Sequence, residues 1–344
     1  MNIFREIIDL GFEQVVFCHD RESGLKAVVA IHSTKAGPAL GGCRMRAYMS
    51  EDEMIADALR LARGMTYKAA VYGLKYGGGK AVIWGSPATD KNPDKFHALG
   101  RFIEGLNGRY ITGLDMGTTV SDMDVIRLET RHVTDTSGSI MAKGDFTAEM
   151  TAYGVYLGIK AAVKHRLGCD GVGGLTVAVQ GLGKVGWRLC SYLHEAGAKL
   201  FISDLNKEAA AAAVRIFGAQ QVPPDRIWMQ ACDVFAPCAL GGILNDRTIP
   251  KLCCAVVAGA ANNQLGLERH ADLLQERNIL YVPDYVINAG GIIITAGELD
   301  GGKEEELRSS VEAVQPMLLN LFRMAKDEGI TALTAANRLA EQAL

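Results

Sequence analysis

The segment 175–204 limits what this chain can fold into more than any other stretch of the sequence. An apolar run over 175–180 precedes a glycine-rich turn, and an amphipathic stretch over 184–197 follows it. A second apolar run, 199–203, ends at Asp204. This order predicts a βαβ unit that binds a dinucleotide, since it consists of a strand, a glycine turn, a helix, a second strand and an acidic residue at its end. The turn has the pattern G-x-G-x-x-G and consists of Gly181, Leu182, Gly183, Lys184, Val185 and Gly186.

Each glycine of this turn has a physical reason. Gly181 permits the tight turn, Gly183 lets the backbone approach a pyrophosphate, and Gly186 lets the helix pack on the strand. The N-terminus of the helix then points its N–H groups at the phosphates. The carboxylate of Asp204 can accept the ribose hydroxyls but would repel a 2′-phosphate. NAD is therefore the expected cofactor, although Lys207 leaves NADP open.

The whole chain predicts two α/β domains. With 344 residues it is long enough for two domains of ordinary size. Strands and helices alternate in the second half, which is typical of a doubly wound, Rossmann-type parallel sheet. The first half also mixes strands and helices, and the polar stretch 135–146 is interpreted as a linker. Expected strands cover 14–20, 26–33, 80–85, 110–113, 233–238, 255–260 and 279–286; expected helices cover 94–106, 121–130, 147–166, 206–219, 303–328, 331–343 and the stretch from the Ser50–Glu53 capping box to Met65.

Composition and charge exclude several classes of function. With 36 basic and 39 acidic residues the net charge is −3, and no basic stripe stands out, so we expect no nucleic-acid partner. The sequence has neither a membrane-length apolar run nor a signal-peptide pattern, which predicts a soluble, cytoplasmic protein. The eight cysteines form no C-x-x-C pair, so we expect neither a metal site nor a disulfide scaffold.

Two lysines and an aspartate in the first half are the candidates for chemistry. Lys80 follows three glycines, but this run is not a P-loop, because Leu74 and Ala81 stand where that motif needs Gly and Ser or Thr. A lysine in such a context lies where backbone can approach a ligand closely. A second cation at Lys68 would lower the pKa of Lys80 and make it usable as a base near neutral pH. Asp115 lies in a glycine turn after a short strand, where catalytic carboxylates are common.

Longer motifs extend over nearly the whole chain. They are GPALGGCRM, LRLARGMTYKAA, GGGKAVI, GLDMGT, TAYGVY, VQGLGKVG, FAPCALGG, AGAANNQL and PDYVINAGG. In this order the motifs resemble the glutamate/leucine/phenylalanine/valine dehydrogenase family. The resemblance implies a substrate domain over 1–135, completed by a C-terminal helix over 329–344, and an NAD-binding domain over 147–328. It also implies reversible oxidative deamination of an L-amino acid by NAD to a 2-oxo acid and ammonia.

The resemblance assigns roles to particular residues. Lys68 is the expected partner of the substrate α-carboxylate, helped by the backbone of Gly41 and Gly42. Lys80 is the lysine expected to activate water, and Asp115 is the expected acid/base at the amino group. Besides the glycine turn and Asp204, the residues expected to contact the cofactor are Thr151, Cys238, Ala239, Ala260, Asn262 and Asn288, with Asn262 also near the substrate.

The resemblance further implies a large apolar L-amino acid as substrate. Leu40 stands where a glutamate dehydrogenase has a lysine that neutralises the side-chain carboxylate, so glutamate and aspartate should be poor substrates. Met65 and Ile292 would extend this apolar wall. Gly113 replaces the alanine usual in leucine enzymes, which should leave space for a ring, and Thr295 departs from both leucine and phenylalanine enzymes. We therefore expect phenylalanine first, then leucine or other branched-chain amino acids, and less favourably tryptophan.

Two other classes of protein are less well supported by the sequence. A catalytically inert, nucleotide-sensing protein on the same fold would be expected to lack Lys68, Lys80 or Asp115, and the chain has all of them. A 2-hydroxy-acid dehydrogenase would need a His–acid pair and a substrate arginine, and the sequence suggests no such set. The resembled family forms symmetric oligomers, so we expect a homo-oligomer, with a dimer favoured.

Overall fold

The computed structural model describes residues 2–239 and 241–344 and forms two compact units. Within the described residues, no helix is both long and apolar enough to cross a membrane. The α/β fold class with a parallel, Rossmann-type second half is confirmed. Unit 1 consists of the chain up to Phe146 with Thr295–Lys303 and Ala340–Leu344, and unit 2 of Thr147–Ile294 and Glu304–Leu339.

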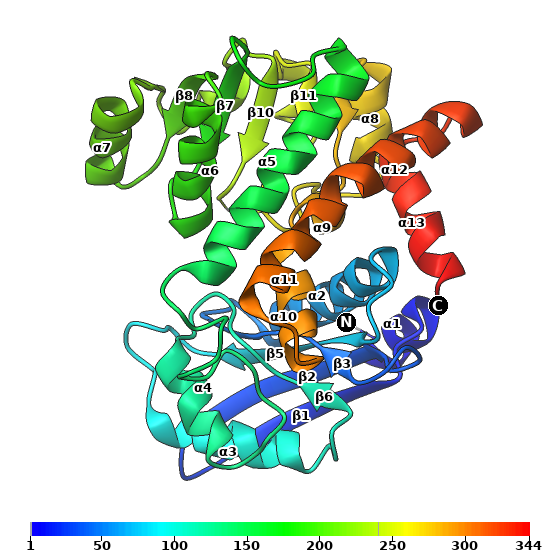
Figure 1. Cartoon of the computed structure of the whole chain (residues 1–344). Coiled ribbons are helices and arrows are strands. Elements are labelled where there is room, and N and C mark those ends of the chain that lie inside the picture. The colour runs from blue at the N-terminus through cyan, green and yellow to red at the C-terminus, as the bar shows by residue number, and fades with distance from the viewer. Residues whose placement is uncertain (1, 240) are drawn as a thin grey trace. The chain divides into compact units, whose positions relative to one another are not determined.

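Unit 1 is built on a mixed sheet of six strands (Figure 1). Its strands are β1 (Gln14–Asp20), β2 (Leu25–Ser33), β3 (Ala39–Leu40), β4 (Cys43–Arg46), β5 (Gly77–Trp84) and β6 (Tyr110–Ile111), and its helices are α1 (Ile3–Leu10), α2 (Glu51–Val71), α3 (Pro93–Glu104) and α4 (Val120–Arg127). The pairs β1–β2 and β2–β5 are antiparallel. β3 and β4 both run parallel to β5, and β3 also pairs with β6. The order across the sheet is β1-β2-β5-β3-β6, with β4 beside β5.

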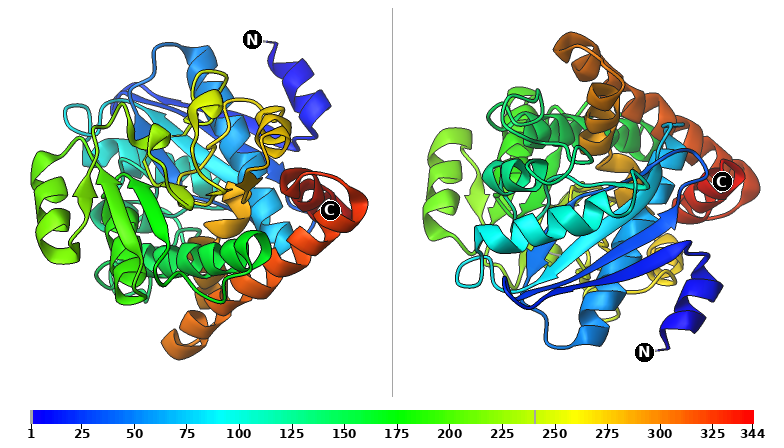
Figure 2. Two further views of the ribbon diagram at one scale, coloured as in Figure 1. Left: turned by 90° about the horizontal axis from the view of Figure 1, so that it is seen from above. Right: turned by 90° about the horizontal axis from the view of Figure 1, so that it is seen from below.

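Strand β2 explains why helices cover both faces of this sheet. Nearly all of its residues are buried, and successive side chains point to opposite faces. Val29 and Ile31 belong to a core with residues of α3 and α4, whereas Val28 and Ala30 belong to a second core with residues of α2. Figures 1 and 2 show the same arrangement, with α2 on one side of the sheet and α3 and α4 on the other.

The glycines before Lys80 serve close packing within unit 1. A Cβ added to Gly77 would lie 1.8 Å from the Ser33 carbonyl oxygen, and one added to Gly78 would lie 2.1 Å from the Thr66 backbone nitrogen of α2. No real side chain fits at these distances, so β5 can lie against β2 and α2 only with glycine here. The structure therefore gives these glycines a packing role in place of the expected approach to a ligand, and it fixes α2 directly on the strand that carries Lys80.

Unit 2 contains a sheet in which every strand pair is parallel. Its elements are α5 (Phe146–Leu167), β7 (Thr176–Gln180), α6 (Lys184–Glu195), β8 (Lys199–Ser203), α7 (Lys207–Phe217), β9 (Gln220–Gln221), β10 (Val234–Pro237), β11 (Val256–Val257), α8 (His270–Glu276), β12 (Leu280–Tyr281), α9 (Asp284–Ile287), α11 (Glu304–Ser310) and α12 (Val314–Glu328), with α10 (Gly290–Leu299) and α13 (Ala332–Gln342) divided between the units. The order is β12-β11-β10-β7-β8-β9, so the chain reverses direction across the sheet between β7 and β10. In Figure 1, α5 and α6 lie in front of this sheet and α8 lies behind it. The carboxyl edge at such a reversal is where dinucleotides bind in this type of fold.

The structure corrects several expected elements. The strand expected over 279–286 is only β12 at its start, and α9 follows, because Pro283 has no N–H to donate to a strand. The strand expected over 255–260 is reduced to the two residues of β11. The helix expected over 303–328 is α11 and α12 with a 3-10 turn between them. The helices α1, α8 and α10 were not expected from the sequence, and α10 begins at Gly290-Gly291, a poor helix-forming pair.

The end of the chain groups mostly with unit 2. We expected 329–344 to complete the substrate domain, but only Ala340–Leu344 belongs to unit 1. The packing of α13 gives the physical reason. Leu333 contacts the core of the parallel sheet, and the Tyr285 hydroxyl donates to Asn337 Oδ1 at 2.8 Å.

We predict that Gly78→Ala destabilises the protein, because the added methyl group would meet the backbone of α2. Overpacking of this kind costs about 1–3 kcal/mol, and urea unfolding followed by circular dichroism measures the loss. Gly64→Ala is the matched control, since Gly64 lies in α2 itself and a Cβ there meets nothing within 4 Å. The control should be neutral or stabilise by up to about 1 kcal/mol. Equal destabilisation by both changes would contradict the packing role.

Candidate active site

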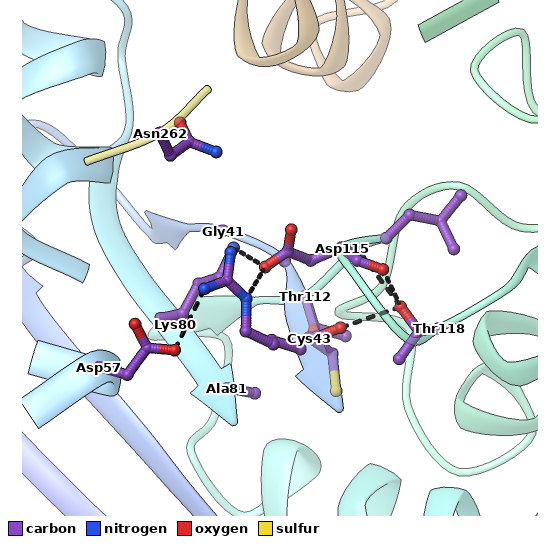
Figure 3. Close-up of polar contacts among 12 residues, drawn as sticks. Gly41, Cys43, Asp57, Lys80, Ala81, Thr112, Asp115, Thr118 and Asn262 are labelled. Carbon is purple, nitrogen blue, oxygen red and sulfur yellow. Dashed lines mark hydrogen bonds and ion pairs between the residues drawn. The ribbon is translucent and has the colours of Figure 1, made fainter. Parts of the chain in front are cut away.

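Lys80 and Asp115 form a buried ion pair in unit 1 (Figure 3). Lys80 belongs to β5, and Asp115 lies in the loop that follows β6. Lys80 Nζ is 2.9 Å from Asp115 Oδ2, and the two side chains are only 7% and 18% exposed. The fold thus brings together the two residues that we expected to be catalytic, in a site that is largely closed to water.

Backbone and hydroxyl groups fix the loop that carries Asp115. The Asp115 N–H donates to Thr118 Oγ1 at 3.1 Å, and this hydroxyl donates to the Cys43 carbonyl oxygen at 2.9 Å. A Cβ on Gly42 would lie 2.9 Å from the Asp115 Cβ, so the loop packs directly on the chain just before β4. Gly42 was expected to assist the substrate carboxylate; in the structure its contact is with the Asp115 loop.

Arg44 is a charged member of this site that the sequence analysis missed. Its Nε is 3.0 Å from the same Asp115 Oδ2, and its Nη1 is 3.1 Å from Asp57 Oδ2 on α2. Burial alone would raise the pKa of Asp115, but Lys80 and Arg44 outweigh burial and hold that pKa well below its ordinary value. Asp115 is therefore ionised at neutral pH. The available signal was charge within apolar segments: Arg44 in GPALGGCRM and Asp57 among the apolar positions of α2.

Lys68 lies in the last turn of α2 and is 9% exposed. Its position follows from the close contact between Gly78 of β5 and Thr66 of α2. Each of these two residues precedes a lysine by two positions, so the segments that carry Lys68 and Lys80 pack against one another. Neither lysine extends into bulk solvent.

Leu40, Gly41 and Met65 also lie around β5. Leu40 is buried in β3, and a Cβ on Gly41 would lie 1.9 Å from a carbonyl oxygen of β5 and 3.3 Å from the Met65 Cγ. Tyr110, which the sequence analysis missed, ties this region together. Its hydroxyl accepts the Ala81 N–H at 3.0 Å and donates to the Gly41 carbonyl oxygen at 2.9 Å.

The structure contradicts the role expected of Gly113. A Cβ at this position would lie 2.4 Å from Thr134 Oγ1 and 2.4 Å from Asp135 Oδ2. Asp135 Oδ2 in turn accepts the Leu114 N–H at 2.8 Å. Glycine at this position lets the Asp115 loop pack on Asp135, and a missing methyl group here opens no space for an aromatic ring.

The glycine turn of unit 2 has the geometry that its glycines predict. Gly181 has φ 97°, a conformation that favours glycine. A Cβ on Gly186 would lie 2.0 Å from the Gly181 carbonyl oxygen, so the helix can pack on the strand end only with glycine there. A Cβ on Gly183 would meet nothing within 4 Å, so the turn is open at the position expected for the pyrophosphate. Lys184 and Val185 begin α6 directly after it.

Asp204 supports the same turn from the end of β8. Its Oδ2 accepts the Leu182 N–H at 2.5 Å, and its Oδ1 accepts the Asn206 N–H at 2.7 Å. The carboxylate therefore lies beside the glycine turn, where an acid that binds ribose is needed. Cys238 and Ala239, just after β10, also contact the turn.

Several buried oxygen atoms at this edge of the sheet lack a hydrogen-bond partner among the described residues. Asn288 Nδ2 donates to Asn262 Oδ1 at 2.8 Å and to the Ala260 carbonyl oxygen at 3.0 Å, but Asn288 Oδ1 is unpartnered. The same holds for Ser203 Oγ and Gln180 Oε1, at the ends of β8 and β7. Unpartnered buried oxygens are uncommon in proteins. A dinucleotide brings ribose hydroxyl and carboxamide donors, so these residues fit an NAD-type group.

The remaining predicted residues are divided between the units. Thr151 lies in α5, where its hydroxyl donates to the Thr147 carbonyl oxygen at 2.8 Å. Ile292 is buried in unit 2, and Thr295 belongs to unit 1. Leu40 and Ile292, which we expected to line one pocket, therefore belong to different units.

Comparison with known proteins identifies the family. The model of the Glu/Leu/Phe/Val dehydrogenase dimerisation domain matches residues 12–132, and the Glutamate/Leucine/Phenylalanine/Valine dehydrogenase model matches 145–206 and 202–344. The chain is 55% identical over 342 residues to the leucine dehydrogenase of Thermoactinomyces intermedius, covering 99% of this chain and 93% of that protein. It is 45% identical over 345 residues to the phenylalanine dehydrogenase of the same organism, covering 100% and 94%.

A solved structure has the same fold over almost the whole length of this chain. The crystal structure of L-tryptophan dehydrogenase from Nostoc punctiforme matches with a TM-score of 0.82 and 46% identity, covering 99% of this chain and 98% of that one. Dehydrogenases of this family are oxidoreductases that generally depend on NAD(P). The predicted family and enzyme class are therefore confirmed: this chain belongs to the glutamate/leucine/phenylalanine/valine dehydrogenase family and is an amino-acid dehydrogenase.

Proposed function

We propose that the protein catalyses reversible, NAD-dependent oxidative deamination of L-leucine and similar apolar L-amino acids to 2-oxo acids and ammonia. The observation that carries this proposal is the buried pair of Lys80 and Asp115, with Lys68 on the adjoining helix. The reaction needs a cation for the substrate carboxylate and groups that move protons at water and at the amine. These side chains are of the required kinds.

The roles of the residues follow from their charges. The glycine turn and Asp204 would hold NAD, which would supply the hydride acceptor for the reaction at the substrate Cα. Lys68 pairs with the α-carboxylate, and ionised Asp115 receives a proton from the substrate ammonium, which must become a neutral amine before hydride leaves. Lys80 in its neutral form takes a proton from the water that attacks the iminium carbon. Asp115 then returns a proton to the amino nitrogen, and as the C–N bond breaks and ammonia departs, the carbinolamine hydroxyl gives its proton to the ionised Asp115, which leaves the 2-oxo acid.

NAD is proposed ahead of NADP because of Asp204. Its carboxylate accepts two backbone N–H groups beside the glycine turn, which supports a fixed negative charge near the ribose. A 2′-phosphate next to this charge would be repelled.

Leucine is proposed ahead of phenylalanine, which the sequence analysis favoured. The main argument for phenylalanine was space at Gly113, and that space is filled by Thr134 and Asp135. The identity of 55% to a leucine dehydrogenase, against 45% to a phenylalanine dehydrogenase, supports the change. Leu40 remains the residue that disfavours glutamate and aspartate, because an unpaired carboxylate beside it would lose hydration without compensation.

We predict that a panel of all the common amino acids, followed by NADH absorbance, gives the fastest rates with leucine and other large apolar side chains. Deamination should be faster at alkaline than at neutral pH, because the amine must be neutral, and NADP should be a poor replacement for NAD.

Lys80→Ala and Asp115→Asn should each lower kcat by about 100-fold or more. Lys35→Ala, an exposed lysine of unit 1, is the control and should retain full activity.

Two outcomes would contradict this proposal. A deamination optimum below about pH 7 would be incompatible with a neutral amine as the reacting form. Absence of NADH formation with every amino acid, in a folded protein that still binds NAD, would favour the inert nucleotide-sensing alternative.

We predict that Gly113→Ala lowers kcat for leucine and phenylalanine alike, by about tenfold or more, because the methyl group would displace Asp135 and with it the Asp115 loop. The ratio of kcat/KM for the two substrates should stay within about twofold of the wild-type ratio. Leu40→Ala is the comparison variant, since a change in a pocket wall shifts such ratios by about tenfold or more. A selective loss of phenylalanine activity in Gly113→Ala would return Gly113 to the substrate pocket.

We also propose that the protein forms a homodimer through the edge of β1. The family model that covers residues 12–132 describes a dimerisation domain. β1 ends the sheet order and has seven residues, whereas the other terminal strands, β6, β9 and β12, have two each. Phe17 in this strand is 54% exposed. A long edge strand with an exposed aromatic side chain favours pairing with a second copy.

We predict that Phe17→Asp yields a monomer, because a charge on the pairing edge must be desolvated in the dimer. Multi-angle light scattering coupled to gel filtration measures the mass. Ile216→Asp is the matched control, since Ile216 is 55% exposed on α7 of unit 2. The control should keep the wild-type mass; a dimer that survives Phe17→Asp would exclude this edge as the interface.

A further inference from the structure

The Asp115 carboxylate is held by two cations on one of its oxygen atoms. Lys80 Nζ is 2.9 Å and Arg44 Nε is 3.0 Å from Oδ2. Figure 3 shows the other carboxylate oxygen of Asp115 pointing away from this contact. The reaction proposed above gives Lys80 a changing charge, since this lysine must lose and regain a proton. When Lys80 is neutral, Arg44 is the cation that still faces the carboxylate.

Arg44 is itself fixed by a second buried carboxylate. Its Nη1 is 3.1 Å from Asp57 Oδ2, and the Asp57 side chain is only 4% exposed. The Tyr48 hydroxyl donates to the same oxygen at 2.8 Å, and Arg60 Nη2 is 2.8 Å from Asp57 Oδ1. A planar guanidinium with donors on two edges can contact two carboxylates at once. Asp57 thus directs one edge of Arg44 toward α2 and leaves the Nε edge for Asp115.

The other titratable groups near Asp115 do not add a competing charge. Burial raises the pKa of the Cys43 thiol and of the Tyr110 phenol, so both are neutral at physiological pH. Burial also raises the pKa of Asp135, and its Oδ2 accepts the N–H of Leu114, the residue before Asp115, at 2.8 Å. The charges that face Asp115 directly are therefore those of Lys80 and Arg44, within the part of the chain that the structure describes.

We propose that Arg44, anchored by Asp57, is a positioning residue that keeps the Asp115 carboxylate ionised and oriented while Lys80 gives up its proton. This inference rests on the proposed function for the role of Lys80, but its electrostatic part concerns Asp115 alone. Arginine suits this role because its guanidinium does not lose its proton at any pH the enzyme meets. Arg44 does not touch the reacting atoms and acts through Asp115.

The test is the pH dependence of kcat/KM in Arg44→Met, with Arg44→Lys as the conservative variant. Without the guanidinium, Asp115 should bind its proton more tightly, so the acid limb of the profile, which in the wild type reflects the substrate amine, should gain the ionisation of Asp115 and become steeper toward low pH. We expect kcat to fall about tenfold or more, with a smaller change in KM for the amino acid. Arg44→Lys should restore part of both. A profile in Arg44→Met that superimposes on that of the wild type would overturn the proposal.

Arg46→Met is the matched control. Arg46 lies on the same strand, β4, and pairs at 3.1 Å with Glu53, another carboxylate of α2, but it is half-exposed and makes no contact with Asp115. Its pH profile should match the wild type. A purely structural role for Arg44 would lower the stability and the amount of active enzyme in Arg44→Met without making the acid limb steeper.

A second measurement separates this proposal from the proposed function. Carbon-13 NMR of aspartate-labelled protein follows the Asp115 carboxyl directly, with Asp115→Asn to assign its signal. In Arg44→Met this signal should titrate at higher pH than in the wild type, whether or not any amino acid is a substrate; an unshifted titration overturns the proposal even if the enzyme is active. If Arg44→Met does not fold, Asp57→Asn removes the anchor instead and should shift the same signal in the same direction by a smaller amount.

Discussion

The ion pairs on one oxygen atom, Asp115 Oδ2, are the interaction on which the site depends. Charges attract more strongly in a buried site than in water, but each ion must first lose its hydration. The arrangement is favourable only where the partners are fixed in advance and close to ideal distance. Lys80, Arg44 and Asp115 come from two strands and a loop that are distant in sequence. The fold of unit 1 therefore does more than hold these side chains in place, because the positions that it gives to Lys80 and Arg44 keep Asp115 ionised.

Glycine serves two opposite purposes in this protein. At Gly78 and Gly113 a side chain would collide with other protein atoms, so glycine removes an obstacle between segments that pack together. At Gly183 a side chain would meet no protein atom, so glycine leaves room beside a helix N-terminus. The sequence shows the same residue in each case. Only the neighbouring atoms distinguish a packing glycine from one that faces a ligand.

This difference explains how far the sequence alone could predict the protein. Local patterns were enough to predict the βαβ unit with its glycine turn and Asp204. The long motifs that resemble the family were enough to predict the pair of Lys80 and Asp115. The roles of Arg44 and Tyr110 arise from contacts between distant segments. A charge within an apolar segment was a local signal that Arg44 is special, but no local pattern identifies its partners. The error at Gly113 has the same origin, because the space beside Gly113 is filled by Asp135, which lies 22 residues further along the chain. The overlong strand over 279–286 is a different case, since Pro283 was a local signal against it.

The chemistry also explains why arginine stands at position 44. A carboxylate beside a lysine is easily kept ionised while the lysine is charged, but the proposed reaction requires that lysine to become neutral. A second lysine at position 44 would respond to the same field and could itself release a proton, so the two cations would titrate together. Arginine keeps its charge and contacts two carboxylates at once, Asp57 through Nη1 and Asp115 through Nε. Arginine therefore supplies Asp115 with a permanent positive charge that does not depend on the charge of Lys80.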